Sequence, residues 1–88
     1  MASRHETIEG LKADAERLMS MATQEPLKEQ VRLALRDMDQ SLLWLSQANA
    51  NEALLKTVDL TLQLAGWRLT MVEDALKSRG PDATLIGG

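Results

Sequence analysis

The stretch SLLWLSQANANEALLKTV, residues 41–58, decides how this chain folds. An apolar run ends there in a segment rich in Ala and Asn, and a second apolar run follows. Apolar residues recur every seven positions on both sides of it, but the second series is three residues out of phase with the first. A single continuous helix would need a stammer at this point. Asn49 and Asn51 are good N-cap residues. The pattern therefore favours a turn at 48–51, with a continuous helix as the alternative.

Composition predicts an all-α protein made of one small domain. The chain has 88 residues, of which 44% are hydrophobic and 26% charged. It contains two Trp but no Phe and no Tyr, and Leu and Ala dominate its apolar residues. Leu and Ala are strong helix formers, whereas strands favour aromatic and β-branched residues. We therefore expect a single helical domain over residues 1–80.

Start and stop signals divide this domain into three helices. Ser3 and Glu6 have the spacing of a capping box, and Pro26 suits the first turn of a helix. Gly80 and Pro81 stop the last helix, because Gly accepts a left-handed conformation and Pro cannot continue a helix. The predicted helices cover about 3–23, 26–47 and 50–79, and residues 81–88 are expected to form a flexible tail.

Short connections between these helices predict antiparallel neighbours. We expect a small three-helix bundle, in which the second and third helices form a long hairpin and the first packs on it. The first two helices each carry one apolar stripe at steps of three and four residues. These stripes are Ile8, Leu11, Ala15, Leu18 and Ala22 on the first helix, and Leu27, Val31, Ala34, Leu35, Met38, Leu42 and Leu45 on the second.

The predicted third helix carries two apolar stripes. The first has the three-and-four spacing of a coiled coil and should face the other helices: Leu55, Val58, Leu62, Ala65, Leu69, Val72 and Leu76. The second lies roughly 150° farther round the helix, at 100° per residue. It consists of Ala53, Leu60, Leu64, Trp67 and Met71.

Two interpretations of this second stripe stay open: it faces the first helix, or another chain covers it. Burying each large side chain is worth about 1.5–3 kcal/mol, and Trp and Met are enriched at interfaces. The second helix also places apolar residues away from its core stripe, among them Leu43, which falls near the polar face. The expected partner-binding residues are Leu60, Leu64, Trp67, Met71, Trp44 and Leu33.

The sequence carries no sign of catalysis, of a cofactor or of a metal. His5 is the single histidine, there is no cysteine, and the glycines form no phosphate-binding loop. Lys28, Arg32 and Arg36 form one basic row on the second helix. Acidic neighbours and a net charge of −3 argue against phosphate binding by this row.

These observations predict a non-enzymatic protein–protein interaction module, such as an adaptor, a small chaperone subunit or an inhibitor. A self-assembling homodimeric bundle is the alternative, and an acidic helical regulator associated with nucleic acid is a minor one. The expected partner is another protein chain, either different or identical, and not nucleic acid, a membrane or a small molecule. The absence of cysteine and of an apolar leader agrees with a cytoplasmic location.

Overall fold

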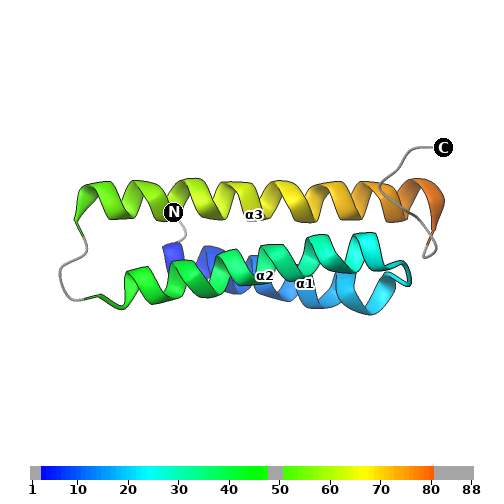
Figure 1. Cartoon of the computed structure of the whole chain (residues 1–88), viewed down its shortest axis with the longest axis horizontal. Coiled ribbons are helices and arrows are strands. Elements are labelled where there is room, and N and C mark those ends of the chain that lie inside the picture. Colours follow the sequence, from blue (N-terminus) through cyan, green and yellow to red (C-terminus); the bar gives the residue numbers. More distant parts are fainter. Residues whose placement is uncertain (1–2, 48–50, 81–88) are drawn as a thin grey trace.

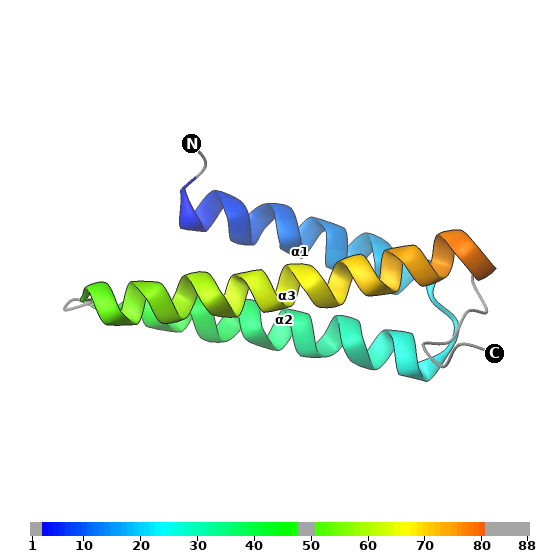
Figure 2. The same cartoon turned by 90° about the horizontal axis from the view of Figure 1, so that it is seen from above.

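A computed structural model describes residues 3–47 and 51–80, which form three helices and no strand. Helix α1 spans Arg4–Met21, α2 spans Glu25–Leu45 and α3 spans Glu52–Arg79. Helix α3 runs antiparallel to α2 and is longer, and α1 packs on both of them (Figures 1 and 2). The predicted three-helix bundle is therefore confirmed. Residues 81–88, the expected tail, lie outside the described part of the chain.

The interruption between α2 and α3 is confirmed as well. Helix α2 ends at Leu45, and the Ser46 N–H still donates to the Leu42 carbonyl, 3.0 Å away. Asn51 is the N-cap of α3, because its Oδ1 accepts a hydrogen bond from the Leu54 N–H at 2.8 Å. Asn49, the other N-cap candidate, falls outside the described residues.

The other helix ends lie within about two residues of their predicted positions. Ser3 caps α1 through a hydrogen bond of 3.1 Å from the Glu6 N–H to its Oγ. The first helix ends at Met21, because Ala22 is already extended. Helix α2 begins at Glu25, which places Pro26 in the first turn, where its missing N–H costs nothing. Gly80 follows α3 with a φ of +81°.

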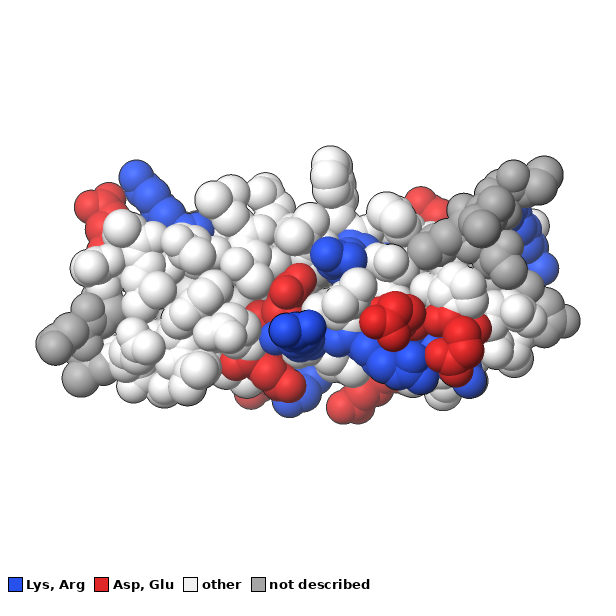
Figure 3. Space-filling view, in the orientation of Figure 1, with Lys and Arg blue, Asp and Glu red and all other residues white. Residues whose placement is uncertain are grey.

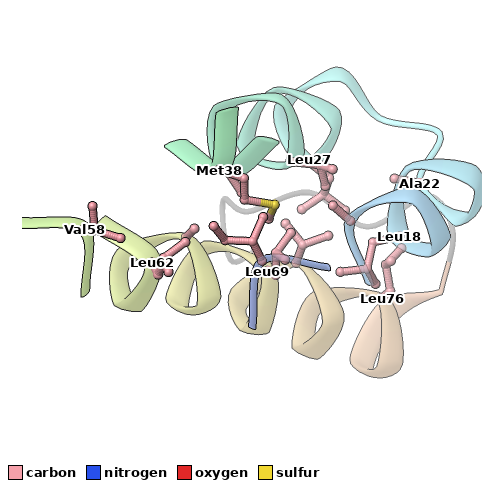
Figure 4. Close-up of a cluster of buried hydrophobic side chains, with 14 residues drawn as sticks. Leu18, Ala22, Leu27, Met38, Val58, Leu62, Leu69 and Leu76 are labelled. Atoms are coloured by element: carbon pink, nitrogen blue, oxygen red, sulfur yellow. The ribbon is translucent and has the colours of Figure 1, made fainter. Parts of the chain in front are cut away.

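One hydrophobic core fills the space between the three helices (Figure 4). Most residues of the three predicted inner stripes are buried in it, and Leu11, Leu35, Leu42 and Leu45 pack at its edge. Leu55, the first member of the inner stripe of α3, is half-buried. Ser41 is the exception to the apolar pattern: it is fully buried, and its Oγ donates to the Asp37 carbonyl at 2.9 Å.

Charged side chains fix α1 against the long hairpin at both ends of α1. Arg4 donates two hydrogen bonds to the Asp59 carboxylate, at 2.7 and 3.0 Å. Near the other end, the Arg17 guanidinium lies 2.6 Å from the Glu73 carboxylate. These contacts place α1 along one flank of α3. Because α1 is ten residues shorter than α3, the end of α2 and the start of α3 project beyond the start of α1 (Figures 1 and 2).

Candidate functional site

The second apolar stripe of α3 lies on the outer surface of the bundle. Its four large side chains are exposed to 66% at Leu60, 45% at Leu64, 73% at Trp67 and 50% at Met71. Ala53, the small fifth member, is exposed as well. We name Leu60, Leu64, Trp67 and Met71 the outer stripe. Neither α1 nor α2 covers it, so the interpretation in which it faces the first helix does not hold within this chain.

Helical geometry explains why this stripe stays outside. The buried residues Val58, Leu62, Ala65, Leu69, Val72 and Leu76 define the inward face of α3. At 100° per residue, the outer stripe lies about 150° from their centre. Two neighbouring helices can share the inner face of α3 and its flanks, but they cannot also reach its back. The apolar side chains there are consequently left to solvent or to another molecule.

The outer stripe forms a shaped surface and not a row of isolated side chains. A shallow depression of about 360 Å³ lies between Leu60, Gln63, Leu64 and Trp67. Two grooves border it on the side of α1: one of about 660 Å³ shares Leu60, and one of about 340 Å³ shares Trp67. In the space-filling view, the edge formed by α3 is uncharged over its middle part, with charged side chains nearer its ends (Figure 3).

Two charged residues near the outer stripe are left without a counter-ion. Lys56 and Asp74 form no ion pair within the described residues, and the same holds for some charged residues elsewhere, such as Lys28 and Arg36 on α2. They are eighteen residues apart, which is five full turns of a helix. Both therefore lie on the same edge of the outer stripe, one toward each of its ends.

The paired carboxylates of the bundle have altered acidities. The Arg4 guanidinium, through its hydrogen bonds, lowers the pKa of Asp59 below its ordinary value of 3.8. Hydrogen bonding from Arg17, with the nearby charge of Lys77, lowers the pKa of Glu73 below its ordinary value of 4.5. Asp59 is exposed and Glu73 is half-buried, and both carboxylates join α3 to α1, which is typical of structural ion pairs.

The two expected partner-binding residues of α2 have less free surface than the outer stripe. Gln30 and Asp37 face α3, since Arg68 lies 3.0 Å from the Gln30 Oε1 and 3.8 Å from the Asp37 carboxylate. Leu33 and Trp44 belong to the same row of α2, at helical steps from these two residues. Both are half-buried, and Trp44 also packs against the core.

Trp44 and Trp67 do not meet. Asp37 of α2 lies beside Arg68 of α3. Trp44 lies two turns after Asp37, and Thr61 lies two turns before Arg68 on the antiparallel helix. Trp44 is therefore level with Thr61. Trp67 is six residues from Thr61, about 9 Å farther along the axis, and it faces away from α2. Trp44 therefore borders the exposed face at the flank, whereas Trp67 stands at its centre.

Sequence reasoning missed one exposed apolar residue and one polar contact. Met21 at the end of α1 is 44% exposed. Leu43, which the pattern placed near the polar side of α2, is exposed. Arg68 contacts Asp37 and Gln30, which precede it by 31 and 38 positions in the sequence. No local sequence pattern predicts such a contact.

The described residues contain no group of three or more His, Cys, Asp or Glu placed to hold a metal ion. His5 is exposed in the first turn of α1.

In the basic row of α2, Arg32 is held by Glu25 at 3.0 Å and by Glu29 at 3.4 Å. Hydrogen bonding from Arg32 also lowers the pKa of the Glu25 carboxyl. The row thus presents a partly neutralised surface.

Comparison with known proteins adds no relative. No family model, no curated protein and no solved structure matches the chain. Among the described residues, no helix is long and apolar enough to cross a membrane.

Proposed function

We propose that this chain is a non-enzymatic protein–protein interaction module, which binds another polypeptide through the outer stripe of α3. One observation carries the proposal: four large apolar side chains line the back of the longest helix, and no part of the described chain covers them. Isolated exposed apolar residues are common on protein surfaces, but contiguous patches mark interaction sites far more often.

The shape and composition of the face support this function. Trp and Met are enriched in the centres of interfaces, and the outer stripe contains one of each beside two leucines. The spacing of its members is that of a helix face laid against another helix. Trp44 and Leu33 would contribute at the rim, because they are half-buried on the adjacent flank of α2.

A rigid scaffold beneath the face also supports it. The inner side of α3 is buried along most of its length, and ion pairs hold α1 in place at each end. The four side chains are therefore presented on a preformed helix, and little conformational entropy is lost when a partner binds. Adaptors, small chaperone subunits and inhibitors can all use such a face.

Site-specific photo-cross-linking in living cells tests the proposal. A photoreactive amino acid replaces Trp67 in one strain and Ala13, which is exposed on α1, in a matched control. We expect a discrete cross-linked polypeptide from position 67 that position 13 does not yield. Equal and diffuse labelling from both positions would refute the proposed role of the outer stripe.

A further inference from the structure

We propose that the polypeptide covering the outer stripe is a second copy of this chain, and that the two α3 helices pack antiparallel about a two-fold axis near residues 65 and 66. This inference rests on the proposed function and specifies the partner. It draws on three properties of α3: the symmetric spacing of the stripe, the placement of Lys56 and Asp74, and the size of the exposed surface.

The spacing of the outer stripe is self-complementary. Its members follow at steps of four, three and four residues, so the series is the same in both directions. In an antiparallel pair centred between residues 65 and 66, Leu60 lies opposite Met71 of the second copy. Leu64 then lies opposite Trp67. Each layer combines a large side chain with a smaller or more flexible one, as close packing between helices requires.

The charges at the edge of the stripe fit the same arrangement. Lys56 and Asp74 are centred on position 65, within half a residue of the centre of the apolar series. Both lie on the same side of the stripe, and a two-fold axis perpendicular to the two helices keeps equal sides together. Lys56 of each copy is thereby placed beside Asp74 of the other. The pairing would supply a counter-ion to each of these two residues, which form no ion pair within the described part of the chain.

A parallel arrangement of the two helices is disfavoured by the same residues. In a parallel pair the two-fold axis runs along the helices, so the same side of the stripe in the two copies falls on opposite edges of the contact. Lys56 would then lie across the seam from Lys56 and far along the axis from Asp74, and both charges would stay without a counter-ion. Lys77, the next basic residue along α3, is oriented about 60° farther from the stripe and is held by Glu73 at 3.8 Å. It is therefore directed away from Lys56 of the other copy in the antiparallel pair.

The exposed area suits a reversible dimer. With roughly 200 Å² for a fully exposed large side chain, the outer stripe exposes on the order of 500 Å² per copy. Two copies would therefore bury about 1,000 Å² in total before the flanks are counted, which is near the lower limit for a specific interface. We expect a dimer that dissociates at micromolar concentrations, with folded monomers below them.

Charge reversal provides the test, since it leaves the apolar stripe intact. Sedimentation equilibrium is measured from about 1 to 500 µM on wild type, Lys56→Glu, Asp74→Lys and the double variant. Wild type should pass from one chain of 9.7 kDa to two. Each single reversal creates two like-charge contacts and should raise the dissociation constant about tenfold. The double variant restores both opposite-charge pairs and should return to within about threefold of wild type.

Mixing the two single variants sharpens the test. In a heterodimer of Lys56→Glu with Asp74→Lys, both edge contacts join opposite charges, so the mixture should associate more tightly than either variant alone. High salt should reduce all of these differences. Leu64→Glu with Trp67→Glu should be monomeric at every concentration, with unchanged helical circular dichroism because both residues are exposed.

Other outcomes would overturn the inference in distinct ways. A wild-type monomer up to 500 µM excludes the second copy as the partner. If position 67 then cross-links a polypeptide of another mass, the proposed function stands and only self-association fails. Suppose instead that the wild type dimerises while the double variant keeps a raised dissociation constant, or while the mixture of single variants associates no more tightly than either alone. Either result refutes the antiparallel two-fold arrangement.

Discussion

Replacing Gly66 by Ala should stabilise the bundle. Gly66 is half-buried in the middle of α3, on the side that faces α1. A Cβ atom added there would lie 3.7 Å from the Leu11 Cδ2, an ordinary van der Waals distance. Gly inside a helix is less favourable than Ala by about 0.5–1 kcal/mol. Since the space accepts the methyl group, Gly66→Ala should raise the free energy of unfolding by about that amount.

The assay is urea unfolding followed by circular dichroism at 222 nm, with thermal unfolding at the same protein concentration. For a domain of this size, 1 kcal/mol corresponds to about 4–8 °C in Tm, so we expect an increase of about 2–8 °C. Gly10→Ala is the matched control. Gly10 lies within α1 with nothing within 4 Å of its added Cβ, so this variant reports helix propensity alone.

The comparison of the two variants can refute this reasoning. If Gly66→Ala lowers the free energy of unfolding while Gly10→Ala raises it, α1 and α3 approach each other more closely than the structure describes. The glycine would then be required for that approach. Equal stabilisation by both variants would show that the Leu11 contact is neutral and that helix propensity accounts for the whole effect.

Burial, capping and charge give three further predictions. Leu62→Ala should cost about 2–4 kcal/mol in unfolding free energy because the side chain is buried, whereas Leu60→Ala in dilute monomer should change it by less than about 0.5 kcal/mol. Asn51→Ala should cost about 1 kcal/mol, because the N-cap hydrogen bond of α3 is lost. Acidification should destabilise the bundle as the pH falls below the ordinary pKa values of Asp59 and Glu73, since both are lowered in the folded state and their contribution is complete only above those values.

Each of these predictions has its own control. Leu60 and Leu62 are compared within one helix, so equal costs for the two variants would contradict the assignment of inner and outer faces. For the cap, Asn51→Asp should retain stability because Asp also accepts the N–H hydrogen bond. For acidification, Asp59→Asn should weaken the dependence of the urea midpoint on pH. Glu9→Gln, an exposed change on α1 away from these ion pairs, should leave it unchanged.

Much of this fold follows from local patterns in the sequence. The spacing of apolar residues identifies the inner faces of all three helices, because a helix returns to the same face every three to four residues. Ser3 and Asn51 could be assigned as caps for a similar reason, since a cap bonds to a backbone N–H only three residues away. The break between α2 and α3 was predictable from a phase change in the apolar repeat.

The same patterns could not assign long-range contacts. Arg4 pairs with Asp59 and Arg17 with Glu73, across more than fifty residues in each case. Their positions depend on how α1 docks on the hairpin, and many charged residues on each helix could have been paired equally well. The burial of Ser41 was not predicted either: it is a polar residue on the buried face of α2, and its hydroxyl donates to a carbonyl of its own helix.

The sequence by itself determined that α3 has two apolar faces, since its periodicity is complete within the helix. It did not determine which neighbour each face meets. The tertiary structure decided that: α1 and α2 pack around the face that includes Val58 and Leu69, and they leave Leu60 and Trp67 uncovered. The physical reason is geometric. Two helices packed together against a third can cover its inner face and flanks, but the surface about 150° away stays out of their reach.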